Sequence, residues 1–275
     1  MRRLPRVFAV TTDSICRAPD FPEKVAALGA LGPDLGIVIR APRMSAGEYA
    51  SLLTHVSATG RRGGAALFGH GRPDLAAACD ADGLQLRRND LPPREARTVF
   101  PGGWIGVSVH GREEAEGAVA DGADFVMVGS VFESGSHPGR PGHGIDWLRE
   151  FTGLGSAIVA IGGVTRERVP AVRRAGASAV AVISAIWDQP DPVGAADAML
   201  QAWEESVESI RLTVNGEPRM VGGPATLERL LQELELDARA VVVELNRRIV
   251  RRPELGHTRL QNGDAVELVH FVGGG

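Results

Sequence analysis

Short β-rich apolar runs alternate with helix-patterned segments along most of the chain. Between several of the runs, apolar residues recur at three- and four-residue spacing, as at 113–120 and 168–175. Alternating βα units require a parallel sheet, and eight of them within about 205 residues predict a compact α/β fold, the (β/α)8 TIM barrel. The eight predicted strands are residues 7–12, 36–40, 65–69, 83–86, 104–110, 125–132, 158–162 and 179–184.

The pattern changes after residue 206. Residues 197–206 form the last predicted barrel helix, with Met199, Leu200 and Trp203 at inward spacing. A shorter α+β pattern follows, so we assign residues 1–208 to the barrel and 209–275 to a small β-grasp (ubiquitin-like) domain. Few glycines or prolines separate Ser206 from Ile210, which predicts a short linker.

The small domain has clear turn and cap signals. Residues 210–214 alternate strictly, and Asn215-Gly216 is typical of a tight hairpin turn. Thr226 is placed to cap an amphipathic helix that runs to residue 234. Further strands are predicted at 241–245 and 265–271, with a turn at 262–264.

A candidate anion site lies in the stretch 158–187. An apolar run ends in Gly162-Gly163, a helical segment opens at Thr165, and the next run leads to Ser184. Glycines leave backbone N–H groups uncovered, so two adjacent strand ends offer amides to one anion, at the usual phosphate position of a (β/α)8 barrel. The alternative is an ordinary βαβ unit whose glycines only form turns.

Composition and charge narrow the function classes. The chain has 275 residues, 44% of them hydrophobic, and a formal net charge of −4 that is mixed along the sequence, which argues against nucleic acid or an anionic membrane as partner. Cys16 and Cys79 are far apart and outside any metal-binding spacing. No apolar window approaches the roughly 18 residues of a spanning helix, so we expect a cytoplasmic protein.

The C-terminal segment resembles the ThiS family of sulfur carriers over the whole length of that family. The resemblance lies in VNGE at 214–217, TLERLLQEL at 226–234 and LQNGDAVELVHFVGGG at 260–275. It implies that Gly275 becomes a thiocarboxylate and that Gly274 keeps the approach to it unobstructed. The implied partners are a ThiF-like adenylating enzyme, which uses ATP to activate Gly275, and thiazole synthase, which consumes the sulfur.

Residues 6–205 resemble the family that contains thiamine phosphate synthase and the thiazole tautomerase TenI. The matching stretches include DGLQLRRNDLP at 82–92 and GVSVHGREEAEGAVADGADFVMVGSVF at 106–132. The resemblance implies a (β/α)8 fold in which a thiazole phosphate is held at the glycine turn and the next strand end, by Gly162, Gly163, Ile183 and Ser184.

The chain departs from the synthase pattern at the other side of the barrel mouth. Of the family's Gln-x-Arg-x-Lys motif only Arg40 remains, and His70-Gly71 stands where the family has an asparagine and its first magnesium-binding aspartate. Asp90 matches the second aspartate, so it would bind Mg²⁺ if the protein were a synthase. A histidine, His137, replaces the lysine that follows the sixth strand.

Fewer carboxylates and lysines mean less charge to stabilise a departing pyrophosphate, so the sequence favours a tautomerase, which needs no metal or cofactor. Arg43, Arg87 and Arg88 lie nearby in the sequence and are candidates for compensating the loss. Thiamine phosphate synthase therefore remains the alternative.

A tautomerase needs one group that takes and returns a proton, and histidine suits this step. The segment that carries the histidine in TenI reads Gly-Ser-Val-Phe at 129–132 here. The remaining candidates are His70, His110, His137 and His143, of which we favour His137 as the catalytic residue. The expected substrate-binding residues are Arg40, His70, Asp90, His110, Ser134 and Ser136.

The sequence thus predicts a fused protein of thiamine biosynthesis, with a tautomerase-like barrel that binds thiazole carboxylate phosphate and a sulfur-carrier domain. Tethering the two raises the local concentration of the second for any shared partner such as thiazole synthase. A barrel that binds thiazole phosphate without catalysis is a further alternative. Whether the chain forms a homo-oligomer stays open.

Overall fold

The chain divides into two compact units, Met1–Ser206 and Val207–Gly275, in a computed structural model that describes residues 3–60, 63–135, 139, 141–206, 209–222, 225–239 and 241–270. Each unit has its own apolar core. The boundary predicted between residues 208 and 209 stays a prediction, because residues 207 and 208 lie outside the described part of the chain.

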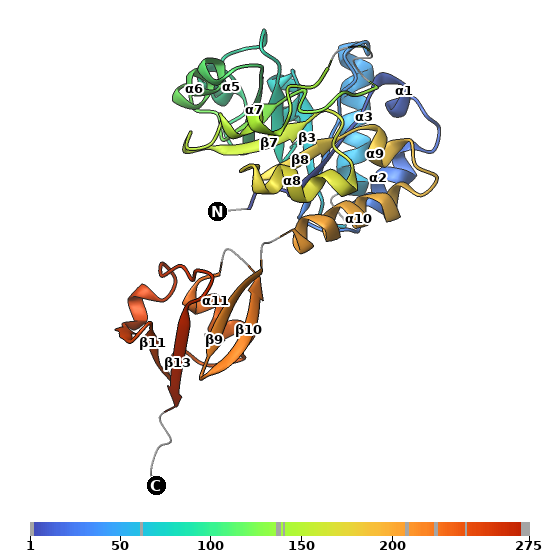
Figure 1. Cartoon of the computed structure of the whole chain (residues 1–275). Coiled ribbons are helices and arrows are strands. Elements are labelled where there is room, and N and C mark those ends of the chain that lie inside the picture. The colour runs from blue at the N-terminus through green and yellow to red at the C-terminus, as the bar shows by residue number, and fades with distance from the viewer. Residues whose placement is uncertain are drawn as a thin grey trace. The chain divides into compact units, whose positions relative to one another are not determined.

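The first unit is the predicted barrel. Eight parallel strands close on themselves in chain order, with β1 paired to both β2 and β8 (Figure 1). The confirmed strands are β1 Val7–Val10, β2 Leu35–Val38, β3 Ala66–His70, β4 Gly83–Leu86, β5 Trp104–Val109, β6 Phe125–Val128, β7 Ala157–Ile161 and β8 Ala179–Val182.

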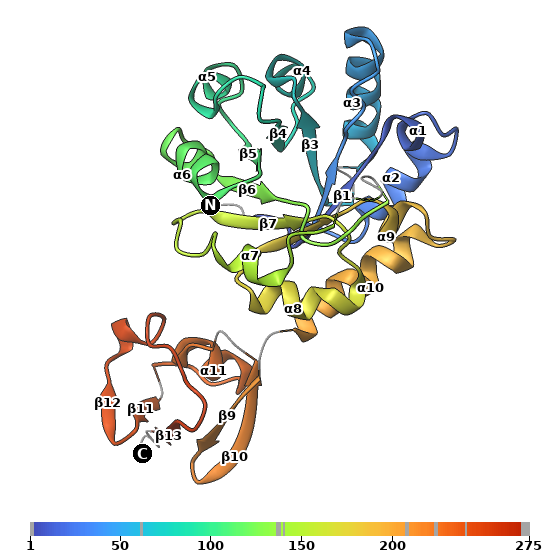
Figure 2. The same ribbon diagram turned by 45° about the horizontal axis from the view of Figure 1, so that its top comes forward.

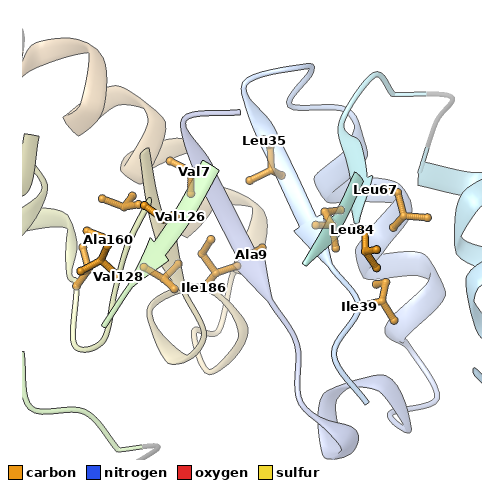
Figure 3. Packing of buried hydrophobic residues seen from close by; sticks show 14 of the residues in the cluster. Val7, Ala9, Leu35, Ile39, Leu67, Leu84, Val126, Val128, Ala160 and Ile186 are labelled. Carbon is orange, nitrogen blue, oxygen red and sulfur yellow. The ribbon is translucent and has the colours of Figure 1, made fainter. Parts of the chain in front are cut away.

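Helices surround the strands and cover their outer side (Figure 2). Outward residues of the strands, among them Val7, Leu35 and Leu84, form with the helices a continuous apolar layer (Figure 3). The helices of this unit are α1 Asp13–Cys16, α2 Phe21–Gly29, α3 Ala46–Gly60, α4 Pro73–Ala78, α5 Pro93–Val99, α6 Arg112–Ala120, α7 Ile145–Arg149, the 3₁₀ turn η1 Arg166–Arg168, α8 Val169–Arg174, α9 Ser184–Trp187 and α10 Pro192–Glu205.

The last barrel helix begins earlier than predicted. It starts at Pro192 rather than at Asp197, because the side chain of Asp191 caps the first turn by accepting a 3.0 Å hydrogen bond from the Gly194 amide. Within the described residues, no helix is both long and apolar enough to cross a membrane.

Phenylalanine rings and glycines fill the barrel interior in matched pairs. Phe8 lies in register with Gly36 on the next strand, and Phe68 with Gly83 in the same way. The ring centroid of Phe8 lies 5.1 Å from that of Phe68 and 5.7 Å from that of Phe125. Each ring therefore uses the space that a neighbouring side chain would otherwise take, which closes the barrel without a void.

The second unit is a five-stranded sheet in the order β10-β9-β13-β11-β12, with one helix packed against it. The predicted hairpin at Asn215-Gly216 is confirmed, and both residues have the positive φ that this turn requires. Thr226 caps the helix as predicted, through a 3.3 Å bond from the Arg229 amide. The elements are β9 Ser209–Val214, β10 Glu217–Gly222, α11 Leu227–Glu233, β11 Val241–Leu245, β12 Arg248–Val250, the 3₁₀ turn η2 Arg252–Glu254 and β13 Ala265–His270.

Strand β12 was not predicted. It pairs with β11 across a tight turn in which Asn246 and Arg247 both have positive φ. Arginine seldom adopts this conformation, so the dipeptide lacks the usual Asn-Gly signal of a tight hairpin.

The matched pairs predict that a methyl group at Gly106 destabilises the barrel. A Cβ atom there would lie 2.1 Å from Cζ of the Phe125 ring, so the core must shift, at a cost of about 1–3 kcal/mol. We expect Gly106→Ala to lower the free energy of unfolding by this amount in urea titrations followed by tryptophan fluorescence, since all four tryptophans lie in the first unit. Gly102→Ala is the control, because nothing lies within 4 Å of a Cβ at that position, and equal losses in both variants would contradict this account of the core.

Candidate functional site

Candidate residues gather at the carboxyl ends of the barrel strands, the edge that carries the active site in (β/α)8 enzymes. Because the strands are parallel and the barrel is closed, these ends form a single mouth in chain order. The ends of β2, β3 and β4 therefore lie across the mouth from the ends of β7 and β8. The two sides carry different chemistry.

The β7 and β8 side has exposed backbone amides. Gly162 and Gly163 follow β7 with φ angles of +102° and +60°, which side chains rarely allow. Ile183 and Ser184 follow β8, where Ser184 begins α9. Within the described part of the chain, no hydrogen bond uses the amide N–H of Gly163 or Ser184. Two of the residues that the sequence predicts to bind a phosphate, Gly163 and Ser184, therefore have unused backbone donors.

The segment after β6, which includes Val131 and Phe132, is hydrogen-bonded to this glycine turn. The predicted strand 125–132 stops at Val128, because the chain then bends to pair with the turn instead: Val131 N donates to Ile161 O and Phe132 N to Gly162 O, both at 2.9 Å. Arg168 donates to Gly163 O at 2.6 Å and stacks over the Phe132 ring. These contacts use the carbonyl groups of the turn and leave its amides available.

The opposite side begins with a buried hydroxyl that ties two strand ends together. Tyr49 from α3 donates to Ile39 O at 2.6 Å and accepts a 2.8 Å hydrogen bond from the His70 amide. This bridge joins Ile39, the residue before Arg40, to His70 at the end of β3. Sequence reasoning missed Tyr49, because nothing in a helix-patterned segment distinguishes a bridging tyrosine from a core one.

His70 is a neutral imidazole in the folded protein. Burial, followed by the positive charges of Arg40 and then Arg87, lowers its pKa from 6.5 to about 4. Near neutral pH it therefore adds no charge to a mouth that already holds two guanidinium groups.

The carboxylate of Asp90 is hydrogen-bonded to Arg87. It accepts a 2.7 Å hydrogen bond from the Arg87 amide, and Arg87 Nε and Nη2 donate to its Oδ1 at 3.0 and 2.7 Å. The hydrogen bond to Asp90 also raises the pKa of Arg87. Of the other nearby arginines, Arg88 pairs with Glu114, while the Arg43 amide donates to Asp13.

The residues present do not fit a magnesium ion held by the protein. The family's first aspartate is Gly71 here, which has no side chain, and the carboxylate of Asp90 is engaged by Arg87. Among the described residues, no group of three His, Cys, Asp or Glu side chains could hold a metal ion. The mouth instead offers guanidinium and backbone N–H donors.

Two further histidines have defined surroundings. His110 Nδ1 lies 3.0 Å from the carbonyl oxygen of Gly129, which can only accept, so Nδ1 carries a proton, and no hydrogen bond to Nε2 is found within the described residues. His143 stacks on Trp147 with a ring separation of 4.2 Å.

Gln85 is a buried polar residue that sequence reasoning did not single out. It lies on β4, 1% exposed, and its Nε2 donates to Leu86 O and Ser108 Oγ. Its Oε1 has no hydrogen-bond donor among the described residues. A buried acceptor without a donor is costly, which makes Gln85 a candidate for contact with a ligand. A lone glutamine in an apolar strand was the available signal.

The other predicted site residues are less well defined. Ser134 is half-buried after β6, and no hydrogen bond is found for it within the described residues. His137, Ser136, Gly274 and Gly275 lie outside the described residues, so their predicted roles stay predictions.

The fold is a (β/α)8 barrel, and comparison with known proteins identifies its family. Residues 7–186 match the thiamine monophosphate synthase family, to which the chain belongs, and residues 212–275 match the ThiS family. The predicted family and fold are thereby confirmed.

Individual relatives agree. Thiamine-phosphate synthase of Thermus thermophilus is 40% identical over 165 residues, which cover 59% of this chain and 80% of the relative. That of Methanoculleus marisnigri is 36% identical over 196 residues, covering 70% and 92%. The thiamine phosphate pyrophosphorylase structure from Pyrococcus furiosus superposes with a TM-score of 0.65 at 29% identity and covers 75% of this chain and 98% of that one. These names favour the synthase alternative over the tautomerase, which we predicted from the residues that depart from the synthase pattern.

The state of His70 predicts a pH dependence of stability. The unfolded chain takes up a proton near pH 6.5 while the folded imidazole resists it down to about pH 4, so stability is lost as pH falls between these values. Between about pH 7.5 and pH 5 the wild type should lose about 2 kcal/mol more than a His70→Gln variant, as measured by urea unfolding. Parallel pH profiles for the two proteins would contradict a neutral, buried His70.

Proposed function

We propose that the barrel is a thiamine phosphate synthase, which joins an aminopyrimidine diphosphate to a thiazole phosphate and releases pyrophosphate. The observation that supports this proposal is two sets of candidate anion donors on opposite sides of one mouth: the unused Gly163 and Ser184 amides on one side and Arg40 and Arg87, whose charges both act on His70, on the other. A substrate pair with one monophosphate and one diphosphate needs both. The synthase names of the relatives support the same proposal.

The two sides have distinct roles in this reaction. Backbone amides hold the thiazole phosphate and fix the ring in the mouth. The bond between the pyrimidine methylene carbon and the diphosphate oxygen breaks, and a bond from that carbon to the thiazole nitrogen forms. Arg40 and Arg87 stabilise the negative charge that develops on the departing pyrophosphate. His70, whose pKa both arginines lower, is neutral near pH 7 and is able to donate a hydrogen bond without adding charge.

Gln85 suits recognition of the aminopyrimidine. Its buried Oε1 has no hydrogen-bond donor within the described residues, and an exocyclic amino group that reached it would supply one. The side chain is oriented by its own bond to Ser108 Oγ at 3.0 Å, so the acceptor is preorganised. A substrate analogue without the amino group would leave this acceptor unpaired.

A tautomerase is the second candidate function for the barrel, because a specific feature of the mouth favours it. The family's first magnesium-binding aspartate is replaced by Gly71, and His110 is oriented through Nδ1, with no hydrogen bond to Nε2 within the described residues. Such an imidazole is able to move a proton without a metal. If the barrel is a tautomerase, His137 or His110 acts as the acid/base. A barrel that only binds thiazole phosphate would show neither synthase nor tautomerase activity.

For the second domain we propose the role of a sulfur carrier. Its match to the ThiS family supports an interaction with sulfur-transfer proteins. A ThiF-like enzyme would adenylate Gly275 with ATP, the thiocarboxylate would form there, and thiazole synthase would consume it. The same chain would then supply sulfur for the ring and use the finished thiazole phosphate.

The synthase proposal predicts turnover and a defined effect of Arg40. Mixing the full chain with aminopyrimidine diphosphate and thiazole phosphate should yield thiamine phosphate, detected by its oxidation to fluorescent thiochrome phosphate. Arg40→Ala should raise KM for the diphosphate by about 10-fold or more and change KM for the thiazole phosphate little, because only the first loses a charge-assisted contact. Formation of aromatic thiazole from its dihydro tautomer without any condensation would favour the tautomerase instead.

The carrier proposal predicts a mass change at the C-terminus. Incubation with a ThiF-like enzyme, ATP and a sulfur donor should replace one carboxylate oxygen by sulfur, measured by intact-protein mass spectrometry. A variant that lacks Gly275 should show no change. A mass shift that persists in that variant would assign the sulfur to another residue and contradict the proposal.

A further inference from the structure

The position of the missing aspartate is occupied by other atoms. Gly71 has a φ of +70°, and a Cβ atom on it would lie 3.0 Å from Asp90 Oδ2 and 3.3 Å from Arg87 Nη2. An aspartate there would require strained backbone, would press on the Arg87 guanidinium and would place two carboxylates together. The local structure therefore disfavours a two-carboxylate metal site and holds a guanidinium group beside Gly71.

Arg87 is fixed in this position by a short turn. The Asp90 amide donates to Arg87 O at 3.1 Å, and the Asp90 carboxylate accepts hydrogen bonds from the backbone amide and the guanidinium of Arg87. The Asp90 side chain is only 9% exposed, whereas that of Arg87 is 55% exposed. Asp90 thus orients the guanidinium while leaving one of its faces open to solvent.

We propose that Arg87, held by Asp90 against Gly71, takes the place of a protein-bound divalent cation and binds the substrate diphosphate together with Arg40, so that this subsite works without a metal ion. The inference rests on the proposed synthase function. It concerns how the diphosphate is held and not which reaction follows.

The formal charges of the two arrangements are equal. The family pattern implied by the resemblance has two aspartates and one divalent cation, which sum to zero. This chain has Asp90 and Arg87, which also sum to zero. The net formal charge of this pair of positions is thereby unchanged although the metal and one carboxylate are gone.

The open donors suit the ligand. Arg87 uses its amide, Nε and Nη2 on Asp90, and no hydrogen bond to Nη1 is found within the described residues. A planar guanidinium binds phosphate oxygens with directed N–H donors and stays charged at any physiological pH. Arg40 and Arg87 both lower the pKa of His70, which places both charges near the same imidazole.

The test is binding of inorganic pyrophosphate to the full chain, measured by isothermal titration calorimetry with a chelator or with Mg²⁺. We expect binding in chelator, with a Kd within about threefold of that in Mg²⁺. Arg87→Ala should weaken binding by about tenfold or more in chelator, because a charge-assisted contact is lost. Arg88→Ala is the matched control, since its neighbouring guanidinium pairs with Glu114, and it should change Kd by less than about twofold.

Several outcomes would overturn the inference. They are pyrophosphate binding that vanishes in chelator and returns with Mg²⁺, no binding in either buffer, or wild-type affinity in a folded Arg87→Ala protein. Tryptophan fluorescence during urea unfolding shows whether each variant is folded. Metal-free pyrophosphate binding without formation of thiamine phosphate would reject the proposed function and keep the metal-free subsite. Formation of thiamine phosphate with pyrophosphate binding only in Mg²⁺ would keep the proposed function and reject the metal-free subsite.

Discussion

Closure of the barrel by three phenylalanine rings is the constraint on which the rest of the first unit depends. Phe8, Phe68 and Phe125 each face a glycine in the register of the neighbouring strand, so three large rings fit where eight strands leave little space. Interiors packed in this way have few alternative arrangements. The ends of all eight strands are consequently held around one mouth, and the chemistry of the site follows from which residues come next in the chain.

Under the proposed function, the mouth offers an anion two kinds of donor that need no metal ion. On one side, positive φ at Gly162 and Gly163 turns the chain so that its carbonyls are used by the segment after β6 and by Arg168, while the Gly163 amide stays available. On the other side, burial and the positive charges of Arg40 and Arg87 lower the pKa of His70, which is therefore neutral near pH 7. This arrangement reconciles a synthase family with a sequence that lacks the family's usual charged ligands.

The architecture was predictable from the sequence because local hydrophobic patterns mark each barrel strand and therefore the order of the strands. Eight apolar runs and the Asn215-Gly216 turn each carry their own signal. Strand β12 escaped prediction because an Asn-Arg pair rarely makes a tight turn. Strand ends were placed too late where tertiary contacts, such as the pairing of Phe132 with Gly162, replaced the ladder.

Site chemistry was only partly predictable. The glycines and the candidate arginines stand out in the sequence, but pairing between side chains does not. Sequence alone gave Asp90 as a metal ligand of a synthase, whereas the structure pairs it with Arg87. The unpaired oxygen of Gln85 and the Tyr49 bridge depend on burial, which no short motif reports.

The central claim is that one mouth holds a monophosphate on backbone amides and a diphosphate on guanidinium groups. The most direct measurement is a crystal structure of the chain grown in chelator with thiazole phosphate and pyrophosphate. The account predicts the monophosphate within hydrogen-bond distance of the Gly163 and Ser184 amides, and pyrophosphate against Arg40 and Arg87. Pyrophosphate bound elsewhere, or a phosphate that avoids both amides, would contradict it.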